Sequence, residues 1–357
     1  MSRYVIDKAK LDENIEIIKN KAGVPLIGVV KGNGYGFGIC ELTKILWKHG
    51  INTFAVTEVT DVSILREVVP DADILVMRST CVKEEALIVA QNGCIATIGS
   101  LEAAEVMNDT AVELGVTVKC HLKIDTGMGR YGFMPSQVED AIKCYEFSNL
   151  KFIGAYTHFS SAFRNSELTK VQLTMLKDTM KQIEKEVGEI GIIHAANSPA
   201  LLNVEDVCLD SVRIGSAFTG RVITRSKIGL NRLGSLEAEV VDVKTVPAGY
   251  SIGYNGLYKT KRETKIAIVP IGHYDGFGLA KEKEIYDFHY VLSVFKRFLK
   301  KQQMYVRING RMFHVIGEIG LSHTAVDITG SDVKVGDLAT VDISPLLVNP
   351  RIERIYK

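Results

Sequence analysis

Up to about residue 230, short β-rich apolar runs alternate with longer segments in which apolar residues recur at helical spacing. This alternation is typical of βα units built around a parallel sheet. We expect strands at 25–30, 52–56, 73–78, 94–99, 116–124, 151–157, 190–195 and 207–212. Helical stretches lie between them, among them 86–93, 101–114 and 165–187. A series of eight such units favours an α/β fold of the closed (β/α)8 TIM barrel type, with an open doubly wound sheet as the alternative.

Beyond Arg232 the pattern changes to short strand-like runs that are separated by Gly, Asn or Asp. These runs fall at 236–246, 264–271, 304–310, 312–319, 324–329 and 338–344. We therefore expect a barrel domain over 1–232, followed by a mostly-β C-terminal domain over 233–357. Within the second domain, apolar residues of 284–303 repeat at helical spacing and basic residues fall between them. This segment predicts an inserted amphipathic helix.

Composition narrows the class of protein. The 357 residues are 46% hydrophobic and 24% charged, which excludes intrinsic disorder. The net charge of +1 provides no bulk field for nucleic acid or an anionic membrane, so we expect neither as a partner. The chain has no apolar run long enough for a secretion signal or a transmembrane helix. Its scattered cysteines, without a CxxC pair, favour reduced thiols and a cytoplasmic location, with disulfides as the alternative.

The first candidate for chemistry is Lys31, which follows the first expected strand. Glycines stand at 32, 34, 36 and 38 directly after it. Catalytic groups of a barrel lie at the carboxyl ends of its strands, and a glycine-rich loop there lets backbone approach a phosphate. The spacing matches neither GxGxxG nor a P-loop. Taken alone, Lys31 fits an exposed loop lysine equally well.

Further motifs accompany Lys31 in a fixed order: GVVKGNGYGFG at 28–38, KIDTGMGRYGF at 123–133, THFSSA at 157–162, HAANSPA at 194–200, SVRIGSA at 211–217, SIGYNGLY at 251–258 and PIGHYDGFG at 270–278. With these motifs the chain resembles the alanine racemase family, barrel-type enzymes that use pyridoxal phosphate. The resemblance implies that Lys31 forms the Schiff base with this cofactor. It also implies that Lys31 and Tyr254 are the two acid/base groups that flank the substrate, and that a homodimer shares its active sites because the tyrosine reaches the other subunit.

The resemblance assigns further residues to the same site. Besides Lys31, the expected cofactor-binding residues are Tyr35, His158, Asn197, Ser198, Arg213, Gly215 and Ser216. Among these, Arg213 would face the pyridine nitrogen of the cofactor, and a permanently charged guanidinium would keep that nitrogen unprotonated. Arg130 would hold the substrate carboxylate. Lys123 matches a lysine that many family members carry as a carbamate, with a plain barrel lysine as the alternative. No metal site is expected.

The chain departs from the family in its β domain. Where the family reads GRICMDQ, residues 317–323 read GEIGLSH, so that Leu321 and Ser322 take the places of the Met and the Asp. We expect both as substrate-binding residues. The family's C-terminal NTIPYE-like segment has no counterpart in 341–357. Because the aspartate is lost, serine is an alternative substrate to alanine.

The function expected from the resemblance is interconversion of L- and D-alanine by a pyridoxal phosphate enzyme with two bases. A decarboxylase of the barrel type is an alternative, although such enzymes use a cysteine of the β domain and no cysteine follows Cys208. A non-catalytic carrier of pyridoxal phosphate is another alternative. Carriers of that type are single barrels, whereas this chain has a second domain.

Overall fold

The computed structural model describes residues 2–224, 228–256, 258–280, 292 and 304–357. It divides into two compact units, Ala9–Leu233 and a unit in which Met1–Lys8 joins Gly234–Lys357. The pattern of the sequence assigns the first eight residues to the barrel instead. They belong to the second unit because β1 (Arg3–Ile6) pairs with β10 (Ser235–Glu239) and with β19 (Glu353–Tyr356).

The unit Ala9–Leu233 is an almost closed parallel barrel, as expected. Its strands are β2 (Leu26–Val29), β3 (Thr53–Val56), β4 (Asp73–Val76), β5 (Ala96–Ile98), β6 (Val118–Lys123), β7 (Leu150–Tyr156), β8 (Ile192–Asn197) and β9 (Ser211–Ile214). They form one 8-stranded sheet in the order β4-β3-β2-β9-β8-β7-β6-β5. A parallel bridge between Leu75 and Ile95 joins the two ends of this order, which rules out the open sheet. All eight expected strands are present, although the last begins at 211 and not at 207.

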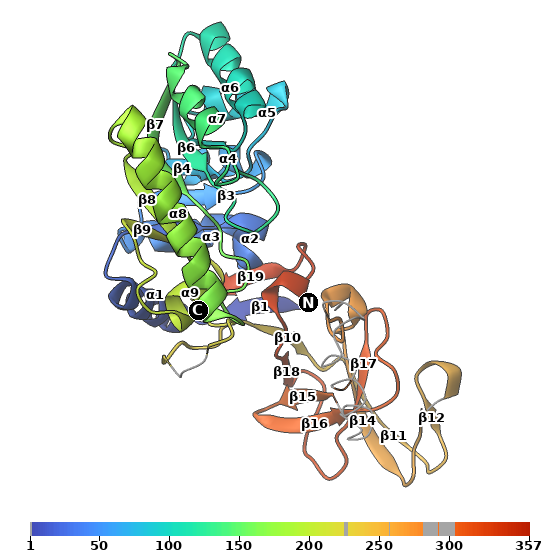
Figure 1. The fold of residues 1–357 in the computed structure, drawn as a ribbon. Helices are drawn as coiled ribbons and strands as arrows, with labels where there is room; N and C mark the ends of the chain where they lie inside the picture. The colour runs from blue at the N-terminus through green and yellow to red at the C-terminus, as the bar shows by residue number, and fades with distance from the viewer. Residues whose placement is uncertain (1, 225–227, 257, 281–291, 293–303) are drawn as a thin grey trace. The chain divides into compact units, whose positions relative to one another are not determined.

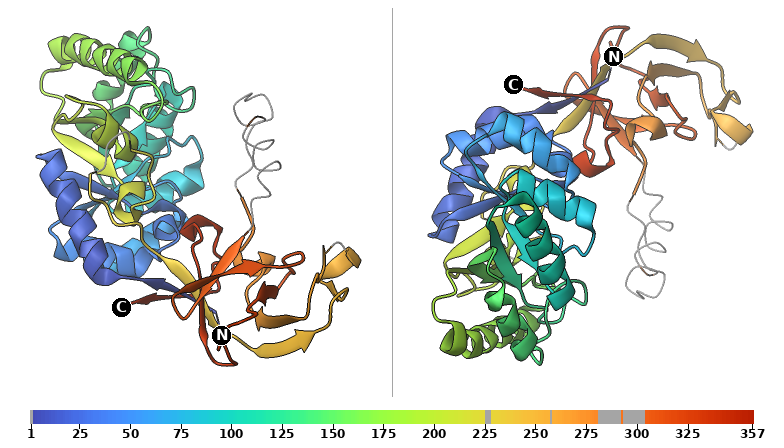
Figure 2. Two further views of the ribbon diagram at one scale, coloured as in Figure 1. Left: turned by 90° about the horizontal axis from the view of Figure 1, so that it is seen from below. Right: turned by 90° about the horizontal axis from the view of Figure 1, so that it is seen from above.

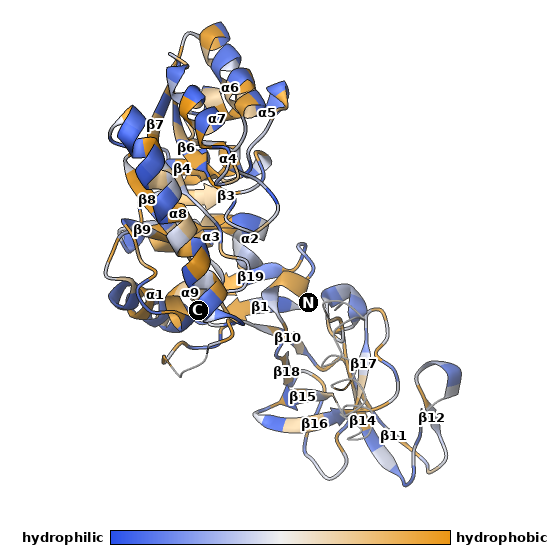
Figure 3. Ribbon diagram, in the orientation of Figure 1, coloured by the Kyte–Doolittle hydropathy of each residue, from blue (hydrophilic) through white to orange (hydrophobic). Residues whose placement is uncertain are grey.

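Helices surround the strands of the barrel (Figures 1 and 2). They are α1 (Lys8–Ala22), α2 (Lys31–Tyr35), α3 (Ile39–Lys48), α4 (Thr60–Val68), α5 (Lys83–Gln91), α6 (Leu101–Leu114), α7 (Val138–Lys143), α8 (Ser166–Val187) and α9 (Ser198–Asn203). The longest, α8, begins where the Asn165 side chain accepts the backbone N–H of Leu168. Its buried residues recur at helical spacing, and hydrophobic and hydrophilic positions alternate along it in Figure 3. Inside the barrel, Ile27, Val29, Ala55, Leu75 and Ile95 pack together.

The second unit is mostly β, as expected. Its main sheet has nine strands in the order β11-β14-β17-β16-β15-β18-β10-β1-β19. The strands not yet given are β11 (Asp242–Val246), β14 (Thr264–Val269), β15 (Tyr305–Ile308), β16 (Arg311–Val315), β17 (Thr324–Asp327) and β18 (Leu338–Val341). A separate pair consists of β12 (Ser251–Ile252) and β13 (Tyr258–Lys259). The helix expected at 284–303 lies outside the described residues, apart from residue 292.

The cysteines are free thiols in this structure, all six being among the described residues. Cys94, Cys120 and Cys144 are buried in the barrel unit. Burial raises the pKa of the Cys94 thiol to about 11 and that of the Cys144 thiol to about 12, so both stay protonated and unreactive at neutral pH. Among the described residues, no helix combines the length and the apolar character needed to cross a bilayer.

Candidate functional site

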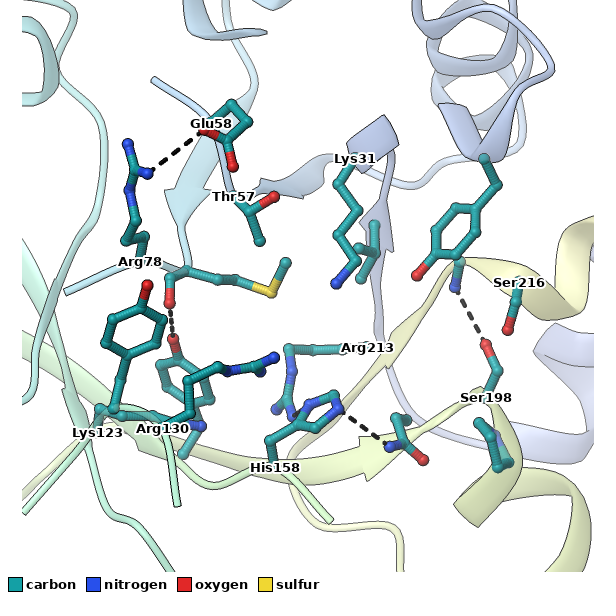
Figure 4. Close-up of a pocket in the computed structure, with 18 residues that line it drawn as sticks. Lys31, Thr57, Glu58, Arg78, Lys123, Arg130, His158, Ser198, Arg213 and Ser216 are labelled. Atoms are coloured by element: carbon teal, nitrogen blue, oxygen red, sulfur yellow. Dashed lines mark hydrogen bonds and ion pairs between the residues drawn. The ribbon is translucent and has the colours of Figure 1, made fainter. Parts of the chain in front are cut away.

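A cavity of about 470 Å³ lies at the carboxyl ends of the barrel strands (Figure 4). This end of a barrel is where loops bring functional side chains together. The cavity gathers every site residue that the sequence predicts within this unit: Lys31, Tyr35, Arg130, His158, Asn197, Ser198, Arg213, Gly215 and Ser216. These residues come from segments far apart in the chain, and each stands at or shortly after the end of a barrel strand. Their convergence makes this cavity the candidate site.

Lys31 enters the cavity from a tight left-handed turn that follows β2. Gly32 and Gly34 of this turn both have a φ of 61°, which glycine adopts without strain. The Lys31 side chain points towards Arg213 (Figure 4). Burial lowers the pKa of the Lys31 amine, and the charges of Arg130 and Arg213 lower it further. A lowered pKa increases the uncharged fraction of the amine, which is the form that can act as a nucleophile or a base.

Arg213, on β9, is only 2% exposed. Its Nη2 donates to the backbone oxygens of Thr157 at 2.6 Å and Ala195 at 3.1 Å. Its Nη1 donates to Nδ1 of His194 at 2.6 Å. Burial lowers the pKa of Arg213 to about 10, so the guanidinium still carries its charge at neutral pH. Among the described residues, these hydrogen bonds use Nη1 and Nη2 and not Nε, and Arg213 itself lines the cavity.

A cradle of small groups lies beside Lys31. The Ser198 hydroxyl accepts the backbone N–H groups of Gly215 and Ala217, each at 3.2 Å. A Cβ placed on Gly215 would lie 2.2 Å from a ring carbon of Tyr35, so only glycine fits at this position. Burial raises the pKa of the Tyr35 hydroxyl to about 12, so it is a hydrogen-bond donor at neutral pH. The Ser198 hydroxyl, which accepts these two N–H groups, can donate its own proton, and with the Tyr35 hydroxyl it suits an anion such as phosphate.

Arg130 is carried by a loop that Asp125 holds in shape. The Asp125 carboxylate accepts the backbone N–H groups of the next residues, including those of Met128 at 2.7 Å and Arg130 at 3.0 Å. The Arg130 side chain is directed into the cavity (Figure 4). Its guanidinium carbon lies 5.8 Å from the centre of the Tyr131 ring. Because its loop is fixed, Arg130 can offer a guanidinium to a carboxylate at a defined place.

Lys123 is buried against an aromatic ring. Its Nζ lies 4.1 Å from the centre of the Tyr156 ring. The Tyr156 hydroxyl is bonded to the Thr97 hydroxyl at 2.9 Å and donates to the backbone oxygen of Met77 at 3.1 Å. Burial lowers the pKa of Lys123 well below its ordinary value, and Arg213 and Arg130 add to this effect. Lys123 is therefore a second amine of lowered pKa in the same cavity.

His158 and Asn197 close another side of the cavity. Nδ2 of Asn197 donates to the backbone oxygen of Phe159 at 3.3 Å, and Oδ1 accepts the N–H of Ala200 at the start of α9. Nδ1 of His158 lies 3.5 Å from Nη2 of Arg213. Burial, followed by the charge of Arg213, lowers the pKa of His158 to about 2. His158 is therefore uncharged at neutral pH.

The sequence analysis missed several residues that line this cavity. Thr57 and Glu58 follow β3, Met77 and Arg78 follow β4, and Tyr156 ends β7. Arg78 and Glu58 form an ion pair, with 3.4 Å between Nη1 of Arg78 and Oε2 of Glu58. The rule that pointed to Lys31, which favours residues just past a barrel strand, would also have found them.

A second cavity, of about 360 Å³, lies within the unit of Gly234–Lys357. It brings together the three remaining predicted residues, Tyr254, Leu321 and Ser322. Tyr254 stands beside β12 and is 69% exposed, and Leu321 is 66% exposed. Ser322, which replaces the expected aspartate, thus lines the same cavity as the candidate acid/base tyrosine. Lys31 and Tyr254 belong to different units of the chain.

Comparisons with known proteins cover nearly the whole chain. The family model for the alanine racemase N-terminal domain matches residues 6–222, and that for the alanine racemase C-terminal domain matches 233–345. An alanine racemase of Methanococcus maripaludis is 32% identical over 94% of this chain and 87% of its own length. One of Chlorobaculum tepidum is 30% identical over 96% of this chain and 86% of its own.

Solved structures resemble the fold along the whole chain. An alanine racemase of Clostridium difficile 630 is 27% identical, with a TM-score of 0.87 and coverage of 100% of this chain and 95% of that one. An alanine racemase of Bartonella henselae with covalently bound pyridoxal phosphate has a TM-score of 0.81 over 100% of this chain and 99% of that one. At 22% identity, this second likeness is one of fold alone.

Proposed function

The chain belongs to the alanine racemase family, and from this membership we propose that it interconverts L- and D-alanine with pyridoxal phosphate bound to Lys31. The family depends on this cofactor. The observation that carries the proposal is the barrel cavity, in which a half-buried amine of lowered pKa faces a buried arginine beside the hydroxyls of Tyr35 and Ser198. Together these groups match the aldehyde, the pyridine nitrogen and the phosphate of the cofactor.

The residues of the cavity fit pyridoxal phosphate in chemical type. Lys31 offers an amine for the aldehyde, and Arg213 offers a charged guanidinium for the pyridine nitrogen. The hydroxyls of Tyr35 and Ser198 offer donors for the phosphate, and Gly215 leaves room beside the Tyr35 ring. When bound, the cofactor supplies the electron sink that carbanion formation at Cα requires and that no side chain offers.

The chain's own groups then hold the substrate and move its proton. Arg130 binds the substrate carboxylate and so orients Cα. The uncharged Nζ of Lys31 takes the proton from one face, and Oη of Tyr254 delivers one to the other face. Tyr254 is exposed within its own unit, so it is available to the barrel of a second copy. We therefore propose a homodimer in which both subunits contribute to each active site. We also propose that it works in the cytoplasm, without a nucleic-acid or membrane partner.

The direct test is to purify the chain with pyridoxal phosphate and to follow both alanine enantiomers by circular dichroism. We expect a visible absorption band from lysine-bound cofactor and decay of the optical signal from either enantiomer. A band without any change in the optical signal would indicate a carrier, and release of carbon dioxide would indicate a decarboxylase. Either result would overturn the proposed function.

Mixing two inactive variants tests the shared site. Lys31→Ala and Tyr254→Phe should each have at most about 1% of wild-type activity, but a heterodimer would combine an intact Lys31 with an intact Tyr254 in one of its two sites. Random pairing of equal amounts makes half of the dimers heterodimers, so about a quarter of wild-type activity should return. Steady-state assays after subunit exchange measure this recovery. A monomer in sedimentation that is fully active would contradict the shared site.

Substitution of Ser322 tests the choice of substrate. Its hydroxyl lines the cavity of Tyr254 and can hydrogen-bond a substrate hydroxyl, whereas a purely apolar site excludes an added hydroxyl by only about 10². We expect the ratio of kcat/KM for L-alanine to kcat/KM for L-serine to be below about 10² in the wild type. In Ser322→Ala this ratio should increase. Ser251→Ala, in the same cavity, is the matched control and should leave the ratio unchanged. An unchanged ratio in Ser322→Ala would remove serine from consideration.

A further inference from the structure

Two buried histidines continue from Arg213 into the wall of the barrel. His194 lies on β8 and His121 on β6, and neither is exposed to solvent. Nη1 of Arg213 lies 2.6 Å from Nδ1 of His194. On the other side of the same ring, Nε2 of His194 lies 2.9 Å from Nδ1 of His121. The three side chains therefore form one hydrogen-bonded series that starts at the cavity and ends inside the protein.

The chemistry of arginine determines where each proton lies in this series. A guanidinium has only donors, so Nδ1 of His194 must accept and the proton of this ring must be on Nε2. That N–H then donates to Nδ1 of His121, which leaves the proton of His121 on its own Nε2. Each ring has room for only one proton, because a second would place two donors against each other.

The burial of both rings agrees with this assignment. Burial, followed by the charge of Arg213, lowers the pKa of His121 to about 4. The same two causes lower the pKa of His194 well below its ordinary value. Both imidazoles are therefore neutral at physiological pH, and each is held in a single tautomer.

The far end of the series indicates which atom of His121 matters. Its Nε2 is buried and has no hydrogen-bond partner among the described residues. This nitrogen faces Gly154 on β7, where a Cβ would lie only 2.8 Å away. A buried, unpaired N–H lowers stability, so His121 is not explained by its own hydrogen bonding. The atom that does have a partner is Nδ1, which accepts from His194.

The series also leaves the charge of Arg213 uncompensated. Burial and Tyr156 are the influences that act on its pKa, and no carboxylate is among them in the described part of the chain. A carboxylate in the place of His194 would hold the guanidinium equally well, but it would cancel the positive charge. Neutral imidazoles orient the guanidinium and leave its full charge directed at the cavity.

We propose that His121 is a positioning residue, which accepts from Nε2 of His194, holds that ring against Arg213 and thereby keeps a fully charged Arg213 in place for the pyridine nitrogen of the cofactor. The part of this inference that concerns the cofactor rests on the proposed function. The part that concerns the tautomers does not. A charged arginine keeps the pyridine nitrogen unprotonated and so limits transamination, in which alanine's amino group and two electrons pass to the cofactor aldehyde and pyruvate leaves.

The first measurement uses the cofactor-free protein labelled with ¹⁵N-histidine. Two-bond ¹H–¹⁵N correlation spectra distinguish the two tautomers and the charged form of each ring. We expect His121 and His194 to be neutral, protonated on Nε2 and constant between about pH 6 and 9, far from an ordinary histidine titration. A proton on Nδ1 of His194, or a charged ring at either position, would overturn the proposal. This spectrum does not depend on racemase activity. It therefore tests the tautomers independently of the proposed function, which the activity assay tests.

A matched pair of variants tests the role of the acceptor. His121→Asn can place an amide oxygen near the position of Nδ1, whereas His121→Leu fills similar space without an acceptor. In His121→Leu we expect shifted His194 signals, kcat lower by about tenfold, the effect of one buried hydrogen bond, and an unchanged KM. The share of turnovers that end in transamination should rise, measured as pyridoxamine phosphate and pyruvate, and His121→Asn should restore all of these values.

Two results would contradict the proposal. Equal impairment of both variants would show that the imidazole ring acts only through packing. Unchanged His194 signals and an unchanged share of transamination in His121→Leu would show that the acceptor has no role. If His121→Leu does not fold, the spectra of the wild type and of His121→Asn still test the proposal. Both proteins have an acceptor for His194, so the His194 proton should be on Nε2 in both.

Discussion

Lys31→Ala should remove measurable racemisation and the covalently held cofactor together. The substitution takes away the amine that bonds the aldehyde and the base for one face of the substrate. A positioned base alone is worth about 10² to 10⁴ in rate, and loss of the covalent attachment adds to this, so we expect a decrease of more than about 10⁴. Circular dichroism of alanine measures the rate, and borohydride reduction followed by peptide mass spectrometry locates the cofactor.

Lys123 provides an internal control for this experiment. It lies in the same cavity and also has a lowered pKa, so it is the other lysine that could bond the cofactor. We expect the reduced adduct on the wild-type peptide that contains Lys31 and none on the peptide that contains Lys123. An adduct that persists in Lys31→Ala, or one found on Lys123, would show that the role of Lys31 is wrong.

The second large effect concerns Tyr254, whose hydroxyl serves the face opposite Lys31. Tyr254→Phe removes one acid/base group and keeps the ring, so we expect turnover to fall by about 10² to 10⁴. Both directions of racemisation must slow equally, because the substitution cannot change the equilibrium between enantiomers. Exchange of the Cα hydrogen with deuterated solvent distinguishes the faces. It should survive better for the enantiomer whose hydrogen faces Lys31.

Tyr250→Phe is the matched control for this prediction. Tyr250 lines the same cavity as Tyr254 and is also exposed, but no role is assigned to it. Its substitution should leave turnover and exchange close to the wild-type values. If Tyr254→Phe loses exchange from both enantiomers to the same extent, the two-base mechanism fails.

Much of the fold follows from local patterns. Parallel strands covered on both faces are short, continuous apolar runs, and for this reason the strands of the barrel were predictable. The 101–114 segment predicts α6 to the residue, since Ser100 caps its start and Gly115 ends it. The pairing of β1 with β10 and β19 was not predictable, because a strand's pattern shows which side chains are buried and not which strand is its neighbour.

Eight βα units, the β domain, the family and the places of Lys31 and Arg213 in their motifs could be predicted, because each follows from apolar periodicity or from a motif of adjacent residues. Closure of the barrel and the contacts of these side chains became visible only in the folded chain. His194 bonds to Arg213, 19 positions away, and to His121, 73 positions away, because β6, β8 and β9 belong to one closed barrel and their side chains can meet in its interior. Hydrogen bonds and burial between residues so distant in the chain leave no local pattern, yet they determine which histidine nitrogen holds each proton and which lysines have a lowered pKa.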